Sequence, residues 1–473
     1  MLYLPLLIFT AFCILLFDIR VGTGGDNVVY IILAKSIVEY HNYLSLYLSN
    51  SPYHTHFPPG FPLILAIFYK FFGPNETYLK IVPLLSSILS FFILTITFRN
   101  FYFLLALSTS PLLIDYSSKL LSESSYLFFS LLSIIFYTNQ KFFLSSTFAG
   151  FTFLIRNAGI SIIFSIVLDL ILKRKFKLSI LSLIISFIFV ISWQLWTITH
   201  KNPNETTYIQ EFFYKNVYNP QLGYISISDL VIRILNNFLS YFFFIIPKST
   251  INLESEFLLN IIGILILIGF LFVLLKEKNF SIIKIYLIFY LIVTLSWPEV
   301  WTSDRFILPI LPFILYFSLN SLNYLNKTIF KLACLFVFGF NFSSLIQKIP
   351  QNINDWLLYK ENPYSLYSPD WQKFFEAINY IKNNISKDKI IVSRKPEFVY
   401  LIAGNKGKVY KFSYNVDSVF LSIKDCDYII LDNFFWTGTT QRYLLPVILK
   451  YKDKFQIVYQ TDEPRTYILK ILK

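Results

Sequence analysis

Long apolar runs, separated by short polar or basic segments, dominate the first 346 residues of the chain. A helix needs about 20 residues to cross the ~30 Å hydrocarbon core of a bilayer. Uncharged stretches near that length are residues 81–98, 178–199, 257–275 and 306–326. Shorter apolar runs lie between them and would need tilt or local thinning of the bilayer to cross. The pattern predicts a polytopic α-helical membrane protein.

Composition strengthens this interpretation. Hydrophobic residues make up 55% of the chain and charged residues 15%, and the mean hydropathy is +0.57, which lies outside the range of soluble domains. The net charge is +13, but the basic residues lie mostly at the ends of apolar runs and in the C-terminal tail. We interpret them as topology signals that face the lipid bilayer, and we expect no nucleic-acid partner.

Basic residues also set the expected topology. The cluster 173–177 is predicted to be cytoplasmic, and residues 2–17 lack the flanks of a cleaved signal peptide, so we expect a retained first helix. Counting from there gives about 11 transmembrane helices in the cell membrane, with residues 101–114 as one of them, a cytoplasmic N-terminus and an extracytoplasmic C-terminus. Three large polar regions are then external: residues 18–80, 200–256 and 347–473. Within the first two, residues 61–72 and 230–247 are predicted to form interfacial helices.

The tail after residue 346 changes character. Helical patterns at 370–383 and 440–450 alternate with strand-like runs, which is typical of an α/β domain. The expected strands are residues 389–393, 409–412, 428–431, 455–459 and 466–472. We therefore predict a transmembrane module over residues 1–346 and an external α/β domain over residues 347–473.

Carboxylates near a membrane are costly unless they are solvated, paired or functional. Asp26 follows two glycines just after the first apolar run and precedes an amphipathic stretch, residues 28–39. Asp115 and Glu123 lie in a shorter loop, residues 108–123, which is the second expected external loop along the chain and lies on the same predicted side as Asp26. Simple structural roles also fit, because Asp26 matches a helix N-cap and Glu123 favours the dipole of the helix that it begins.

Histidine and arginine supply the candidate cations. His54 and His56 are two apart, so in an extended segment they would face the same way and share a metal ion or a phosphate; a solvated loop is the alternative. Arg156 and Arg305 lie at predicted external helix ends, where a guanidinium can bind phosphate through two nitrogens. Snorkelling of these arginines to lipid headgroups fits equally well.

The order of these motifs resembles the GT-C superfamily of glycosyltransferases, and most closely the relatives of protein O-mannosyltransferases and the lipid A aminoarabinose transferase. The shared features are Asp26 after an outward helix, the Pro-Pro-Gly-aromatic-Pro turn at 58–62, the Ser-Pro loop leading to Glu123, and the Arg-aromatic-x-Leu-Pro-x-x-Pro segment at 305–312. The resemblance covers residues 2–320 and, more loosely, the tail.

The resemblance implies a polyprenyl-phosphate sugar donor, an inverting displacement and an acceptor that is a protein, a glycolipid or a polysaccharide. It implies that Asp26 is the general base and that Glu123 supports the site. His56 stands near the position of the family's basic residue before the prolines. Some relatives use a divalent metal ion, for which His54 and His56 are the candidates here. Candidates for substrate and phosphate binding are His56, Arg156, Arg305, Asp115 and Tyr30.

Two other classes of membrane protein remain open at this stage. A transporter or flippase for lipid-linked sugars would need polar or broken helices at the bilayer midplane and often internal repeats, whereas the acids here cluster at one face. An O-antigen ligase or polymerase would use arginine and histidine in a later loop. The region 200–256 offers only His200 and Arg233, without an evident constellation.

Overall fold

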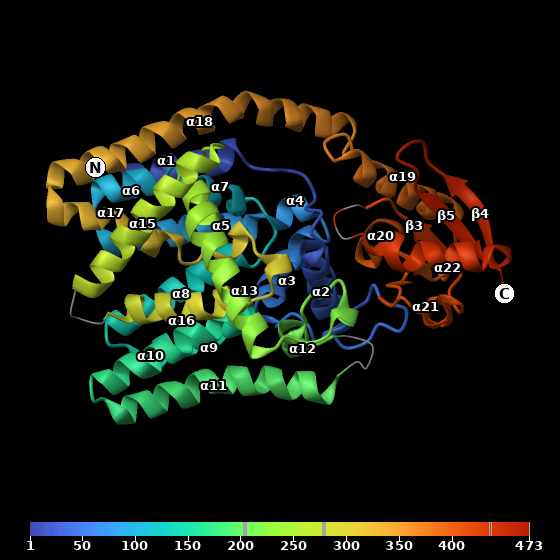
Figure 1. Ribbon diagram of the computed structural model, residues 1–473, viewed down its shortest axis with the longest axis horizontal. Helices are drawn as coiled ribbons and strands as arrows, with labels where there is room; N and C mark the ends of the chain where they lie inside the picture. Colours follow the sequence, from blue (N-terminus) through green and yellow to red (C-terminus); the bar gives the residue numbers. More distant parts are fainter. Residues whose placement is uncertain (202–205, 277–280, 435, 437, 473) are drawn as a thin grey trace.

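A computed structural model describes residues 1–201, 206–276, 281–434, 436 and 438–472. The part of the expected external loop 200–256 that covers residues 202–205 lies outside the described residues. Long helices packed side by side form most of the molecule, and a smaller part that contains the β-sheet lies at one end (Figure 1). The prediction of a largely helical chain with apolar spans and a C-terminal mixed sheet is confirmed.

Five helical segments of the described chain are long and apolar enough to cross a membrane. They are Glu76–Phe98, Phe176–Thr199, Ile227–Thr250, Glu256–Lys276 and Lys327–Glu361. Shorter apolar helices lie among them: Leu4–Leu15, Gly60–Phe72, Phe142–Ile155, Asn157–Leu172 and Ile282–Ser296. The total of about 11 crossings and their sidedness stay predictions.

One expected span is broken. Residues 101–114, predicted as a continuous crossing, form α6 (Phe101–Leu107) and α7 (Pro111–Ser117), with Ser108, Thr109 and Ser110 between them. Pro111 causes the break, because proline has no amide hydrogen for the preceding helix and disfavours helical geometry in the residue before it. The prediction of one helix there was wrong, and most side chains of α7 are buried.

The two segments expected to be interfacial are both helical. α3 (Gly60–Phe72) begins against the end of α9 (Phe142–Ile155), where a Cβ on Gly60 would meet backbone atoms of Leu154 at 2.6 Å. The second, at 230–247, belongs to a continuous run made of α13 (Ile227–Ser240), η3 (Tyr241–Ile245) and α14 (Ile246–Thr250). Since that run is long enough to cross a bilayer, its interfacial position stays a prediction.

The tail contains a five-stranded sheet in the order β2-β1-β3-β5-β4. β1 (Ile391–Val392), β2 (Gly407–Lys408) and β3 (Tyr428–Leu431) are parallel, and β5 (Tyr467–Ile471) and β4 (Phe455–Gln460) add antiparallel. The sheet differs from the expectation in one strand, because β2 pairs at 407–408 and residues 409–412 are irregular. Of the expected helices, residues 370–383 form α19 (Pro369–Asn384), whereas 440–450 divide into η6 (Thr440–Leu444) and α22 (Leu445–Lys450).

A single long helix links the two parts. α18 (Lys327–Glu361) has 35 residues, about 50 Å at 1.5 Å per residue, and runs along one side of the helical part toward the tail (Figure 1). The predicted boundary at residue 346 therefore falls inside a continuous helix. The division into two domains stays a prediction.

The tail packs directly on residues of the segment 18–80. Val28 and Ile32 of α2 (Asp26–Tyr40) share a buried core with Trp371 and Phe374 of α19. Backbone hydrogen bonds add to this contact, because Gly407 N–H donates to the Tyr47 carbonyl at 2.8 Å. The helix that begins with Asp26 is thus held by both parts of the molecule.

A buried acid in the tail predicts pH-dependent stability. Asp432 is 4% exposed, and its Oδ1 accepts hydrogen bonds from Thr440 Oγ1 and the Phe434 amide. Its Oδ2 has no hydrogen-bond partner among the described residues. Burial raises the pKa of Asp432 to about 6. The folded state therefore holds this proton more tightly than the unfolded chain, where the pKa is about 3.9.

Stability from this group is present below about pH 4 and is lost as the pH rises through about 6, a difference on the order of 3 kcal/mol. Asp432→Asn should therefore raise the stability of the folded tail at pH 7, and that stability should depend less on pH between pH 4.5 and 7.5. Hydrogen exchange of β3 amides in the full chain measures this. Asp425→Asn, at an exposed position, is the control, and equal protection by both substitutions would contradict the assignment.

Candidate active site

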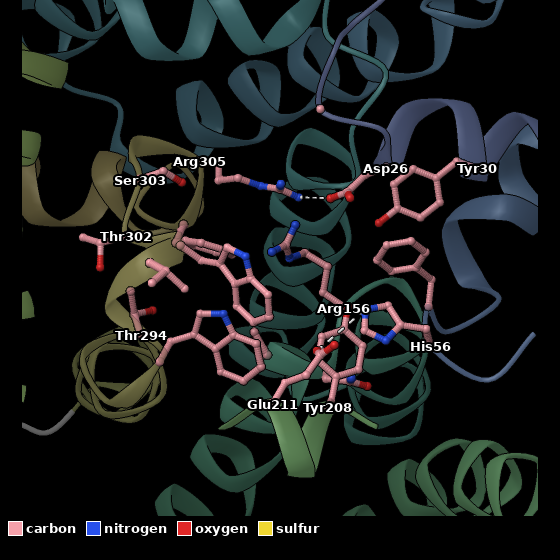
Figure 2. Close-up of a pocket in the computed structure, with 18 of the residues that line it drawn as sticks. Asp26, Tyr30, His56, Arg156, Tyr208, Glu211, Thr294, Thr302, Ser303 and Arg305 are labelled. Carbon is pink, nitrogen blue, oxygen red and sulfur yellow. Dashed lines mark hydrogen bonds and ion pairs between the residues drawn. The ribbon is translucent and has the colours of Figure 1, made fainter. Parts of the chain in front are cut away.

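A cavity of about 780 Å³ lies where the segment 18–80, the end of α9, the 200–256 region and the tail meet. Its walls come from α2, α12 (Tyr208–Phe213), α16 (Ile282–Ser296), the loop 297–306 and residues of the tail. Asp26, Tyr30, His56, Arg156 and Arg305, all predicted from the sequence, line it (Figure 2). The structure thus brings together side chains that lie far apart in the sequence.

Asp26 is placed by a tightly held loop. Gly25 before it has a φ of +99°, which glycine adopts without strain. The side chain of Asn27 donates to Glu76 Oε2 at 2.8 Å, and Glu76 Oε1 accepts from the Gly22 amide at 3.1 Å. Lys395 of the tail donates to the Gly24 carbonyl at 2.8 Å. Contacts on both sides of Asp26 therefore fix the start of α2.

Arg305 joins the two predicted acids. Its Nη2 lies 3.0 Å from Asp26 Oδ2, and its Nε lies 2.6 Å from Glu123 Oε1. Burial favours the neutral form of Arg305, but the neighbouring Glu123 and Asp26 carboxylates outweigh it and raise the pKa of the guanidinium. Arg305 thus stays charged beside Asp26 (Figure 2).

Glu123 lies behind this pair and also binds Arg156. It is the first residue of α8 (Glu123–Thr138) and is 1% exposed. Arg156 Nη1 contacts Glu123 Oε1 and donates to Ser122 Oγ at 3.1 Å. The Tyr30 hydroxyl lies 3.4 Å from the same Ser122 Oγ. One buried carboxylate therefore holds two guanidinium groups together at the cavity wall, an arrangement suited to a dianionic ligand.

The two predicted histidines do not act as a pair. His54 is 3% exposed, its Nδ1 lies 2.9 Å from Ser45 Oγ, and its Nε2 accepts from the Phe57 amide at 2.8 Å. Both ring nitrogens of His54 are thus engaged within the loop, whereas His56 faces the cavity. In the described part of the chain, no group of three or more His, Cys, Asp or Glu side chains gathers as metal ligands would.

Asp115 also lies away from the cavity. It pairs with Lys119 one turn along the chain, and its side chain is half exposed. It lines a second cavity of about 920 Å³, on the other side of the loop that carries Thr302 and Ser303. The structure therefore does not bring Asp115 to Asp26, because the break at Pro111 turns its helix away.

Sequence reasoning missed Glu211. This acid lies on α12, where it is 6% exposed, and its Oε1 accepts from Thr206 Oγ1 at 2.8 Å. Its Oε2 lacks a hydrogen-bond partner within the described chain and lies 3.9 Å from His56 Nε2. Burial raises the pKa of Glu211. The capping box formed by Thr207 and Gln210 was the local signal for this short helix.

Aromatic residues and the tail complete the cavity. Trp297 and Trp301 come from the loop after α16, and Trp371, Arg394 and Trp436 come from the tail. Only tertiary packing brings the tail residues here. The cluster Trp297-Pro298-Glu299-Val300-Trp301 between two apolar runs was the visible signal for the loop.

The geometry before Asp26 leads to a matched pair of predictions. Gly25→Ala should cost about 1–2 kcal/mol of folding stability, because an alanine disfavours a positive φ. Gly24→Ala should behave like wild type, since a Cβ there meets no described atom within 4 Å and the φ is not positive. Thermal unfolding of both variants in nanodiscs measures this. Equal behaviour of the two would contradict it.

Comparisons with known proteins show the fold. No protein-family model matches the chain, and no curated protein matches it in sequence. ArnT from Cupriavidus metallidurans bound to undecaprenyl phosphate superposes with a TM-score of 0.57 at 12% identity, covering 98% of this chain and 96% of that chain. The apo state of that protein gives a TM-score of 0.58 at the same identity and coverage. ArnT is a GT-C lipid A aminoarabinose transferase, so the expected fold is confirmed across both parts of the chain.

Proposed function

We propose that this protein is an integral membrane glycosyltransferase that transfers a sugar from a polyprenyl-phosphate donor to an acceptor on the extracytoplasmic face. One observation carries the proposal: Asp26, Glu123, Arg156 and Arg305 form a connected acid and guanidinium cluster at the wall of a large cavity. The ArnT-like fold supports it, because one of the similar structures holds undecaprenyl phosphate.

The two arginines would bind the donor phosphate. A guanidinium presents planar donors that match phosphate oxygens and stays charged at any pH of interest. As the bond between sugar and phosphate breaks, negative charge grows on the phosphate, and fixed donors stabilise that charge more than they stabilise the ground state. Arg156 and Arg305 are already oriented by Glu123, so little reorganisation is needed on binding.

Asp26 would act as the general base. In an inverting displacement the acceptor oxygen attacks the anomeric carbon, the bond from that carbon to the phosphate oxygen breaks with its electron pair, and the acceptor proton passes to the Asp26 carboxylate. The contact of Asp26 with Arg305 at 3.0 Å supports this role, because a phosphate bound by Arg305 would lie beside the base.

The proposal also fits the membrane environment. A prenyl chain stays in the bilayer while its phosphosugar lies at the interface, so a cavity at the external ends of helices is accessible to the donor. We therefore place the protein in the cell membrane with the cavity outside the cytoplasm. The acceptor would be a protein, a glycolipid or a polysaccharide, brought to the same cavity from the outer side.

The test is transfer of radiolabelled sugar from a panel of polyprenyl-phosphate sugars to membrane acceptors, with the protein reconstituted in proteoliposomes. Transfer from at least one donor by wild type is the expected result. Binding of undecaprenyl phosphate to the same preparation is measured in parallel. Absence of both transfer and binding would overturn the proposal and favour a transporter or a scaffold.

A further inference from the structure

A row of aromatic rings follows one wall of the cavity. The ring centroids of His56 and Tyr208 lie 4.2 Å apart and nearly parallel, those of Tyr208 and Trp297 lie 5.8 Å apart, and those of Trp297 and Trp301 also lie 5.8 Å apart. All four residues line the cavity. The wall therefore offers a continuous surface of ring faces and edges.

This wall lies across the cavity from the charged cluster. Figure 2 shows Tyr208 and Glu211 on the side away from the pair of Asp26 and Arg305, with Arg156 reaching between the two sides. The ion pair of Asp26 and Arg305 thus lies apart from the part of the wall that carries Tyr208 and Glu211. A donor phosphate would go to the arginines, which leaves the aromatic wall for a second ligand.

Glu211 adds a buried polar group to the aromatic wall. Its Oε2 has no hydrogen-bond partner in the described residues and borders the cavity beside His56. A buried polar atom without a partner costs free energy. A ligand hydroxyl at this position would supply the missing hydrogen bond and would be recognised in doing so.

The row extends to the tail. Trp301 Nε1 donates to the Tyr218 hydroxyl at 3.1 Å, and the rings of Tyr218 and Trp436 make a perpendicular edge contact with centroids 6.4 Å apart. Arg394 of the tail lies over the rings of both Tyr218 and Trp436, at 5.7 and 5.6 Å. The aromatic surface is therefore longer than one ring and spans from the helical part to the tail.

We infer that this aromatic wall is the acceptor subsite and that the acceptor is a saccharide, either a glycolipid or a polysaccharide. The inference rests on the proposed function and narrows its acceptor class. Sugar rings present apolar C–H faces and a rim of hydroxyls, which match ring faces and a single free carboxyl oxygen. The length of the row fits a chain of sugars rather than one side chain of a polypeptide.

The test measures binding directly, with the full chain in nanodiscs. The probes are maltotriose, cellotriose and triacetylchitotriose at millimolar concentration, with a serine- and threonine-containing hexapeptide of similar size for comparison, followed by saturation-transfer NMR. We expect at least one saccharide to bind and the peptide not to bind. Trp301→Ala and Glu211→Leu should each weaken saccharide binding about five- to tenfold, as expected for loss of a ring contact or a polar contact.

Trp356→Ala is the matched control, because Trp356 is a partly exposed tryptophan on α18 that does not line the cavity. Undecaprenyl phosphate binding reports whether each variant is folded, and Trp301→Leu, which keeps an apolar side chain, replaces Trp301→Ala if the latter misfolds. Saccharide binding that is unchanged in the Trp301 variants, absent in wild type, or exceeded by peptide binding would overturn the inference.

The same experiment separates this inference from the proposed function. If the protein binds undecaprenyl phosphate but no saccharide, the inference of an acceptor subsite is wrong and the proposed donor binding is not contradicted. If the protein binds saccharide through Trp301 but binds no polyprenyl phosphate and transfers no sugar, the aromatic wall is still a saccharide site. The proposed transferase function is then wrong.

Discussion

Asparagine in place of Asp26 is expected to slow sugar transfer by about 100- to 10,000-fold, the range typical for loss of a general base. Asparagine has nearly the same shape, and its amide oxygen can still accept a hydrogen bond from Arg305, which lies 3.0 Å from Asp26. It cannot take the acceptor proton. Binding of undecaprenyl phosphate should persist, because both arginines remain. Single-turnover transfer rates, with binding measured separately, distinguish the two effects.

Asp115→Asn is the matched control for this experiment. Asp115 comes from the second external loop, is half exposed and pairs with Lys119 outside the cavity. Its substitution should leave transfer close to wild type. If Asp26→Asn were equally active, Asp26 would only be the first residue of α2 and an ion-pair partner of Arg305, and the proton would have to leave by another group.

Helix counting assigned the members of the charged cluster to one expected side of the membrane. Asp26 and Arg305 are 279 residues apart and both were expected at external helix ends, but their direct contact did not follow from a shared side. Arg156 followed from the same reasoning. The signal is strong because charges are excluded from apolar spans and concentrate where the spans end.

Other parts of the site depend on packing that no local pattern carries. His54 and His56 have similar surroundings in the sequence, but a single loop turn buries His54 against Ser45 and leaves His56 in the cavity. Glu211 lies in a six-residue helix whose partner, His56, comes from another loop. The tail reaches the cavity only because its helices share a core with α2.

Glutamine in place of Glu123 is expected to destabilise the protein by about 3–5 kcal/mol, the cost of breaking a buried ion pair from one side. Glu123 is 1% exposed and its Oε1 contacts both Arg156 and Arg305. Without this charge two guanidinium groups would face each other in a buried position, with Asp26 as the remaining carboxylate on Arg305. Thermal unfolding of the purified protein in nanodiscs, wild type against variant, measures the loss.

Glu376→Gln provides the control, since Glu376 lies on α19 of the tail and its more exposed carboxylate pairs with Lys373. Exposed pairs contribute about 0–1 kcal/mol, so this variant should unfold close to wild type. Equal losses in the two variants, or none in Glu123→Gln, would contradict a buried bridging role. A destabilised Glu123→Gln protein that still binds undecaprenyl phosphate would show that Glu123 contributes to stability and is not required for binding the lipid phosphate.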